Sequence, residues 1–426
     1  MRVFLLRLIV AAVGIATVSP VLAQNVRSRD RTFEASETLA ADLRRARIHA
    51  GPFYLLSNIE FSDLGYENQF FFPTSEQSGG LSLAVSAPQK LYFVPARKTI
   101  YSLTVTPEYA FSQKGASQAP WGYLVRGDAH FLLNHLYINA YAVQSNKLQA
   151  LSGEINRVVT QREETAGVQG EIRYSSKTRA MYSASARHYS YPLSRYQPPD
   201  LTTDVGTRGS LLDLNRHEQN GRLSLLHHTF PLTALTFAGE VNKYTFPFAA
   251  DRNSVRHYVA PGFSYDAGVV TWKAEAGPAV LHFYTPGGSG DFRGIVGSTQ
   301  YGRRLGPKMQ LTIAGDRDVD FSIAEGERYY VADRALFAID RQATRRLTLR
   351  FSSTLGRDTY PALTVNPADV QLARRRDEFS FTAIGWRYTM RHAKGGFDIG
   401  YYQRRSNFQI DEQNGIRLAI ALSLSP

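Results

Sequence analysis

The chain has 426 residues, a formal charge of +12 and 12% aromatic residues. Its mean hydropathy of −0.28 indicates that apolar residues are spread along the chain rather than gathered into long runs. The sequence has no cysteine, which excludes a disulfide scaffold, a thiolate metal site and a cysteine nucleophile. The basic excess suits an anionic partner.

Residues 1–23 have the pattern of a cleaved export signal. Arg2 and Arg7 supply positive charge, residues 5–16 are apolar, and residues 21–23 form a small-residue cleavage site. The apolar run is shorter than the roughly 20 residues that span a bilayer, which disfavours a membrane anchor. We therefore expect export through the Sec pathway. An exported chain rarely meets nucleic acid, so polysaccharide, lipopolysaccharide or small anions become the expected anionic partners.

Residues 24–47 are polar and are predicted to form a periplasmic N-terminal lead-in. Within residues 34–46, a helix would place Leu39, Leu43 and Ala46 on a common side. No later apolar stretch is long enough for a spanning helix, so a membrane-inserted mature chain would have to be a closed barrel.

From Ile48 onward the apolar residues recur with period 2. In residues 101–112 the odd positions are almost all large and apolar, while the even positions are polar or small. Residues 416–425, 166–174 and 347–352 follow the same rhythm. Because successive side chains of a strand point to opposite faces, these segments have one apolar face and one polar face.

Weaker segments with this rhythm are evenly spread along the rest of the chain. They are residues 51–61, 81–87, 123–132, 136–143, 181–191, 221–229, 235–244, 255–265, 269–283, 292–303, 309–317, 330–341, 379–388 and 397–404. The whole series amounts to about 16 to 18 strands of ~10 residues, long enough to cross a bilayer when tilted. We predict an all-β fold, a transmembrane antiparallel up-and-down β-barrel over residues 48–426, in the cell outer membrane.

A soluble β-sandwich or propeller would also show alternation. Its strands average only about 5 to 6 residues, half the length of the longest runs here. Aromatic residues such as Tyr101 and Phe111 lie near the ends of these runs, where the interfacial girdles of a membrane barrel require them. These observations favour the membrane barrel.

The connections between the predicted strands have two lengths. Residues 175–178 and 342–344 are predicted to be tight turns, whereas 192–219 and 356–377 are predicted to be long surface loops. The second loop would carry Arg374–Arg376. That cluster would meet lipopolysaccharide phosphates if it faced outward, or a periplasmic partner if it faced inward.

Charged residues on the polar faces are candidates to line a lumen. Where the alternation is clear, Arg173, Arg350, Arg417, Glu108 and Glu171 lie opposite the apolar stripe. A basic residue on the lipid side would cost about 2 to 4 kcal/mol at the bilayer midplane, which favours the lumen. An arginine-rich lumen would attract anions. The alternative is that arginine and glutamate form ladders that only brace the wall.

The sequence shows no catalytic motif. It has no nucleophile elbow, no His-Glu-x-x-His, no phosphate loop and no cofactor motif. His227 and His228 would point to opposite faces of a strand and cannot chelate one metal. We expect no enzyme, no cofactor and no metal, although a Ser–His pair assembled from different strands would leave no linear motif. Arg126–Asp128, an adhesive tripeptide elsewhere, would lie inside a strand and not be presented.

Short patterns in the predicted barrel resemble a known family. Gly51-Pro-Phe53 lies in the opening strand, Gly65-Tyr-Glu-Asn-Gln69 follows it, and Thr106-Pro-Glu-Tyr109 lies in a later strand. They resemble the outer-membrane β-barrel porin family associated with exopolysaccharide and capsule export. The resemblance implies passage or anchoring of a polysaccharide without catalytic residues. The chain ends Leu424-Ser425-Pro426, whereas such barrels usually end on an aromatic residue.

Three functions remain open on the sequence. The first expectation is a basic pore for exopolysaccharide export, with an anionic or neutral polysaccharide as cargo and periplasmic export components as partners. The second is a general or anion-preferring porin for small solutes. The third is a non-conducting barrel that acts as an enzyme or a surface-binding structure. In each case we expect outer-membrane lipid, lipopolysaccharide and the barrel assembly machinery as partners.

Overall fold

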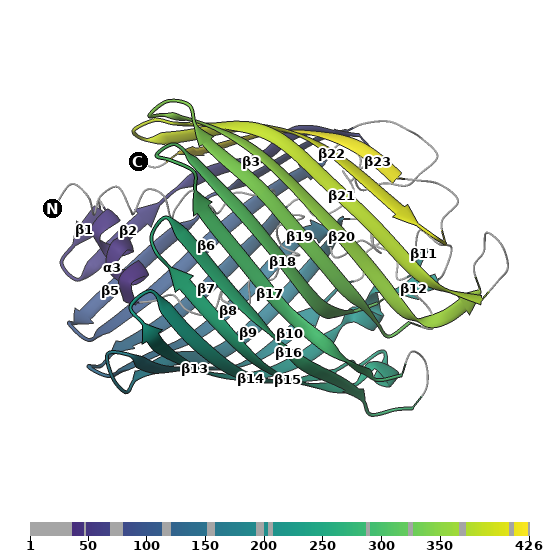
Figure 1. The fold of residues 1–426 in the computed structure, drawn as a ribbon. Coiled ribbons are helices and arrows are strands. Elements are labelled where there is room, and N and C mark those ends of the chain that lie inside the picture. The colour runs from purple at the N-terminus through teal and green to yellow at the C-terminus, as the bar shows by residue number, and fades with distance from the viewer. Residues whose placement is uncertain are drawn as a thin grey trace.

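The structure, a computed structural model, is a single β-barrel (Figure 1). It describes residues 36–46, 48–68, 80–112, 121–150, 158–192, 200–202, 208–286, 290–322, 327–365, 372–408 and 413–424. The predicted signal peptide, residues 1–23, and the lead-in residues 24–35 lie outside the described residues.

Strands make up most of the described chain. The helical elements are α3 (Ser36–Arg45), η2 (Leu211–Leu214) and η3 (Ala250–Arg252). The strands of the first half are β1 (Ile48–Ala50), β2 (Phe53–Ser57), β3 (Ile59–Asn68), β4 (Gly80–Ser86), β5 (Gln89–Ala96), β6 (Thr99–Ser112), β7 (Trp121–Leu132), β8 (Leu136–Ala150), β9 (Val158–Arg173), β10 (Thr178–Ser190), β11 (Asp200–Thr202) and β12 (Arg208–Ser210). Those of the second half are β13 (Arg216–Phe230), β14 (Thr233–Thr245), β15 (Ser254–Asp266), β16 (Val270–Phe283), β17 (Phe292–Arg304), β18 (Met309–Phe321), β19 (Tyr329–Gln342), β20 (Leu347–Val365), β21 (Leu372–Thr389), β22 (Ala393–Ser406) and β23 (Gln413–Leu424).

The barrel wall has 18 strand positions among the described residues. β2 and β3 follow one another in one position, and β4 and β5 share the next, since β6 pairs with both of the latter. Neighbouring strands are antiparallel, and the ring closes where β23 pairs with β3. Each predicted strand segment overlaps one of these positions, so the predicted all-β antiparallel barrel is confirmed.

A short strand completes the seam of the barrel. β23 runs beside β3 as far as Leu424, which lies opposite Ile59. β1 then pairs with β2, with Ile48 opposite Leu55, and so continues the line of β23. The edge of β2 is thereby covered by the N-terminal side of the chain, which limits the unpaired strand edge at the seam.

The two ends of the barrel differ in the length of their connections. Residues 174–177 and 343–346 are tight turns, as predicted, and they lie at the end that also holds α3 and the last residues of β23 (Figure 1). The longer connections lie at the opposite end. This arrangement is typical of barrels with short periplasmic turns and longer outer loops.

The first predicted long loop is confirmed as the long connection between β10 and β13, whereas the second is much shorter than predicted. The segment 192–219 contains the hairpin β11–β12, the turn η2 and the start of β13. The segment 356–377 is mostly strand, so Arg374–Arg376 lie in β21 and not in a loop. The strands here continue beyond the apolar band, where both faces are polar and the alternation that reveals a strand is lost.

The outer and inner faces of the wall differ in polarity. On β13, Leu223 points outward and is 61% exposed, whereas Arg222 points inward. Exposed tryptophans lie near both ends of the outer face, with Trp121 beside the long connections and Trp386 near the short turns. None of the described helices is long and apolar enough to cross a membrane.

Candidate pore and its constrictions

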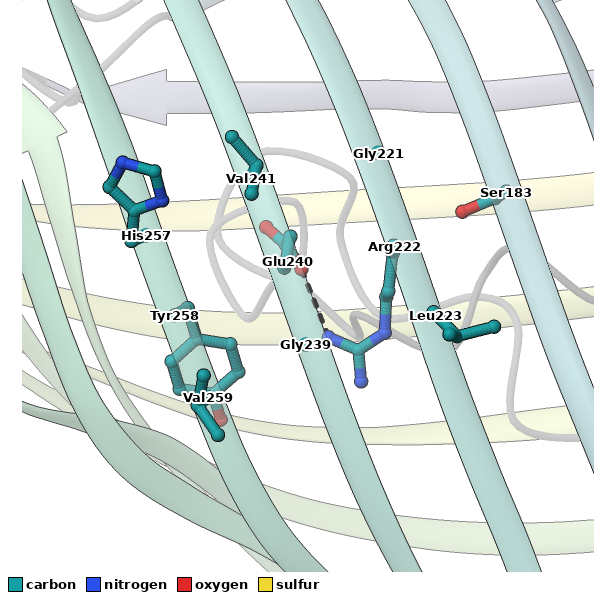
Figure 2. A pocket seen from close by; sticks show the side chains of 10 residues that line it. All are labelled: Ser183, Gly221, Arg222, Leu223, Gly239, Glu240, Val241, His257, Tyr258 and Val259. Atoms are coloured by element: carbon teal, nitrogen blue, oxygen red, sulfur yellow. Dashed lines mark hydrogen bonds and ion pairs between the residues drawn. The ribbon is translucent and has the colours of Figure 1, made fainter.

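One part of the inner wall carries an arginine between two glutamates. Arg222 of β13 donates to Glu240 of β14 at 2.9 Å and to Glu275 of β16 at 2.7 Å (Figure 2 shows the first bond). Register places Arg222 directly opposite Glu240, and Tyr258 of β15 donates to Glu275 at 3.1 Å. This group has two carboxylates and one guanidinium, so negative charge is in excess.

A second group lies on β9, β10 and β13, nearer the long connections. Arg187 lies 3.1 Å from Glu163 and 3.5 Å from Glu218, and Arg216 lies 2.7 Å from Glu218. The Arg216 guanidinium also covers the ring of Tyr189 at 4.4 Å. Arginine and glutamate are balanced here, which is the wall-bracing ladder that the sequence left open.

The wall formed by β19 to β22 holds the most deeply buried ion pairs. Arg334 and Asp358 are 2.6 Å apart, and Asp377 lies 2.7 Å from both Arg375 and Arg404. These side chains are at most 4% exposed. Charges so far from water are tolerated only when they are paired and hydrogen-bonded. In this group the arginines outnumber the aspartates.

A second basic group lies on the same wall, closer to the short turns. Arg350 of β20 lies 3.7 Å from Asp340 of β19. Asp398 of β22 interacts with Arg387, Arg350 and Arg417. Gly385, directly opposite Asp398, has no side chain at the place that the carboxylate occupies.

The residues predicted to line the lumen fall into three places. Arg350 and Arg417, 9% and 8% exposed, belong to the basic group around Asp398. Glu171, near the short-turn end of β9, accepts a hydrogen bond from Arg173 at 2.6 Å, and Arg173 itself is exposed. Glu108 of β6 lies near the other end of the barrel, opposite Gly122, and is half-buried.

The wall opens between β17 and β18 near the long connections. These strands pair only from Gly297 and Arg317 toward the short turns. Beyond that point β17 remains paired with β16 alone, and β18 with β19 alone as far as Phe321 opposite Tyr329. The described residues 318–322 and 327–330 therefore leave the ring as a hairpin, which we name the inner hairpin, while Val331 and Ala332 still pair with β20.

The inner hairpin packs against the inside of the wall. Val319, Phe321 and Tyr329 continue the outward-facing set of their strands, yet they belong to one apolar cluster. The wall side of this cluster consists of inward-facing residues of β15, β16 and β17. They are Tyr258, Ala260, Ala279, Leu281, Phe283, Phe292 and Val296. Only a hairpin that bends into the barrel can bring an outward face against an inward one.

Polar contacts fix the flanks of the inner hairpin. Arg256 of β15 and Asp318 are 2.7 Å apart and almost fully buried. Arg328 donates to the carbonyl of Thr285 at 2.9 Å, and the backbone N–H of Ala362 donates to Glu327 at 3.3 Å. The hairpin is thus attached to three separate parts of the wall and narrows the lumen on the side of β14 to β17.

The helix α3 occupies the inner face at the short-turn end. The predicted helix is confirmed, and Leu39, 2% exposed, packs with Tyr92 of β5 and Ile100 of β6. Asp42 accepts hydrogen bonds from Lys90 at 3.1 Å and from Tyr92 at 2.7 Å. Lys90 and Tyr92 alternate with the outward-facing Leu91, so they face the lumen and α3 lies inside the barrel.

The sequence alone did not reveal either constriction. The strand predicted from the sequence ends at residue 317. If its alternation is continued, Val319 and Phe321 fall on the outward face, and nothing in the pattern marks the point where the strand bends. The one available signal was Arg317, a charge at an outward-facing position where an apolar band would not have one.

Two smaller features of the sequence concern the tripeptide Arg126–Asp128 and the side chains that could bind a metal. Asp128 is buried in β7 and accepts hydrogen bonds from Arg126 and Asn139, so the tripeptide Arg126–Asp128 is not presented, as predicted. Among the described residues, no group of three or more histidine, aspartate or glutamate side chains has the geometry to hold a metal ion.

A shallow hollow lies in the outer face of β13 to β15 (Figure 2). Gly221 and Gly239 lack side chains there, and open space surrounds the place where a Cβ would stand. Leu223, Val241 and Val259 surround the two glycines and are exposed. The hollow belongs to the apolar band and not to the lumen.

Comparison with known proteins identifies the fold. No family model and no curated protein matches the chain. A BenF-like porin from Pseudomonas fluorescens Pf-5 superposes with a TM-score of 0.51 at 11% identity, over 87% of this chain and 99% of that one. The outer membrane protein OpdK from Pseudomonas aeruginosa gives 0.51 at 10% identity, over 87% and 99%. This is a porin fold.

The porin fold agrees with the barrel architecture that the resemblance in the sequence implied. A second structure of OpdK, determined with vanillate, superposes with a TM-score of 0.50 at 10% identity, over 87% of this chain and 99% of that one. At these identities the likeness concerns the fold alone. An association with exopolysaccharide export is not shown.

Proposed function

We propose that this protein is an outer-membrane channel for small polar solutes. The observation that carries the proposal is a closed barrel with an apolar outer face, a charged inner face and a hairpin folded into its lumen. Such a barrel can sit in lipid, offer water and ions a polar path, and limit the size of what passes. Its fold is that of solved porins.

Polysaccharide export, the first expectation from the sequence, is the weaker candidate. The comparisons support porins for this fold and give no support to an exporter. The inner hairpin and α3 also narrow the lumen near its two ends. A bulky polymer would have to displace both elements, whereas a small solute would only have to pass beside them.

We infer a modest preference for anions. Most inner arginines share carboxylates, so their charges are largely compensated. The compensation is uneven, because arginines are in excess on β19 to β23 and glutamates are in excess around Arg222. A solute would therefore pass between a basic and an acidic wall. Two groups with excess arginine face one group with excess glutamate, so the lumen attracts anions modestly and does not repel cations strongly.

Single-channel recording in planar bilayers tests the proposal. The purified full-length protein is first shown to be folded by a heat-modifiability gel. Discrete conductance steps are then recorded under a salt gradient, and vanillate and an uncharged oligosaccharide are tested as blocking solutes. We expect ohmic steps, a small anion preference and block by the small carboxylate only.

Other outcomes would contradict the channel. A folded barrel that never conducts would favour a non-conducting surface-binding structure or an enzyme. Block by the oligosaccharide at lower concentration than vanillate would favour the polysaccharide exporter.

A further inference from the structure

The register of five strands places a row of alternating charges on the outside of the barrel. Arg317 of β18 lies opposite Asp333 of β19, and Asp333 lies opposite Arg357 of β20. Arg357 lies opposite Glu378 of β21, which lies opposite Arg405 of β22. Each strand contributes one charged residue in register with its neighbours, so the residues form one continuous row across the strands.

The side chains of this row interact with one another while remaining open to the surroundings. Arg317 and Asp333 are 3.0 Å apart, and their side chains are 51% and 35% exposed. Arg357 lies 3.5 Å from Glu378, and both are 49% exposed. Arg376, two residues before Glu378 on the same face of β21, donates to the same carboxylate. We name these six residues the outer charge row.

The outer charge row lies at the edge of the apolar band. Leu355, two residues before Arg357 on the same outward face, is 56% exposed. Glu378 and Trp386 are separated by eight residues of β21, or about 27 Å along the strand. With a typical strand tilt this is about 20 Å of height, close to the ~25 Å of an apolar band. Trp386 lies near the short turns, so the row lies at the opposite, outer boundary.

Arginine is in excess in the outer charge row. Arg317, Arg357, Arg376 and Arg405 accompany only two carboxylates, Asp333 and Glu378. Guanidinium groups bind phosphate through paired hydrogen bonds, and an excess of them over nearby carboxylates favours an anionic ligand. The outer leaflet of an outer membrane presents phosphate at this height, on the glucosamine headgroup of lipopolysaccharide.

We propose that the outer charge row binds the phosphate groups of lipid A. This inference rests on the outer-membrane location in the proposed function, but it does not depend on conduction. The two carboxylates keep the arginines aligned both with and without bound lipid. The exposed edges of the guanidinium groups contact the phosphate. An exposed ion pair on the far side of the barrel lacks the excess, because Arg162 of β9 is balanced by Glu164 of the same strand at 2.7 Å.

Native mass spectrometry of the full-length protein in detergent tests this proposal. The probes are bis-phosphorylated lipid A, the same lipid A after removal of both phosphates, and inorganic phosphate as a competitor. We expect bound bis-phosphorylated lipid A in the wild type. The triple variant Arg357→Gln, Arg376→Gln and Arg405→Gln should bind it at least about tenfold more weakly, since even one lost charge-assisted contact is worth about that factor in affinity.

Matched variants keep the test decisive. Arg162→Gln removes an exposed outer-face arginine from the balanced pair and should leave lipid A binding unchanged. Arg376→Gln alone serves if the triple variant fails the heat-modifiability gel, and it should give a smaller loss in the same direction. Equal binding by the triple variant and the wild type, or equal binding of the dephosphorylated lipid, would overturn the proposal.

Competition with inorganic phosphate distinguishes binding of the lipid A headgroup from binding of the free phosphate ion. Lipid A that stays bound in excess inorganic phosphate assigns the row to the lipid headgroup. Complete displacement by inorganic phosphate would overturn the lipid assignment and leave a site for the free ion. Neither readout uses conductance, so a silent channel would refute the proposed function without affecting this result.

Discussion

Phe321 of β18 packs edge-on against Tyr244 of β14, with ring centroids 4.8 Å apart, although three strands of the wall separate them. The contact exists because the inner hairpin leaves the ring beyond Arg317 and lies across the inner face of β15 to β17. The same ring meets Phe246 at 4.8 Å. The narrowing of the lumen thus depends on a few aromatic contacts.

The substitution Phe321→Ala should loosen the inner hairpin. It removes two aromatic pairs that together contribute about 1 to 3 kcal/mol beyond simple burial. We expect larger or more frequently fluctuating single-channel steps with an unchanged heat-modifiability gel. Phe237→Ala, an exposed outer-face phenylalanine of β14, is the matched control and should conduct like the wild type. If the two variants gave identical single-channel conductance steps, the inner hairpin would not be a constriction of the lumen.

The substitution Asp358→Asn should destabilise the barrel. It leaves the guanidinium of Arg334, whose side chain is 4% exposed, without its carboxylate partner 2.6 Å away. Losing one member of a buried pair costs about 3 to 5 kcal/mol. We expect a lower temperature at which half of the protein loses the gel mobility of the folded barrel. Glu164→Gln breaks the exposed pair with Arg162, worth at most about 1 kcal/mol, and an equal loss there would contradict the argument.

The substitution Leu39→Asp should release α3 from the short-turn mouth. A carboxylate at a position that is 2% exposed cannot stay against Tyr92 and Ile100 without a large desolvation cost. We expect higher conductance, because the helix would leave the inner face. Arg45→Asp places a carboxylate on the exposed side of the helix and changes the net charge by two units rather than one, yet its conductance should match that of the wild type.

Ion selectivity should change in opposite directions on the two walls. Replacing Arg350 and Arg417 by serine reduces the basic excess around Asp398 and should shift the reversal potential toward cations. Replacing Glu240 and Glu275 by glutamine should shift it toward anions. A change of about one kT in local potential corresponds to about a threefold change in the ion ratio. Equal selectivity in both double variants would exclude these groups from the conduction path.

The sequence by itself determined the architecture of this protein. The period-2 alternation from residue 48 onward predicted a segment in each of the strand positions of the wall, although it missed β5, and the spacing of Leu39 and Leu43 predicted α3. These features are local, because each strand must expose one apolar face whatever its neighbours are. For the same reason the outward position of Leu223 and the inward position of Arg222 could be inferred from their own strand.

Only the tertiary structure decided which charged groups meet and where the lumen narrows. Arg222 and Glu275 are 53 residues apart, and their contact depends on the register of three strand pairings. The alternation also says nothing about where a strand leaves the ring, so Phe321 reads as lipid-facing in sequence and lies inside the barrel in the fold. Turns and hydrophobic patterns set the register of each neighbouring pair. Which residues meet across several strands, and where two strands separate, depends on the whole closed sheet.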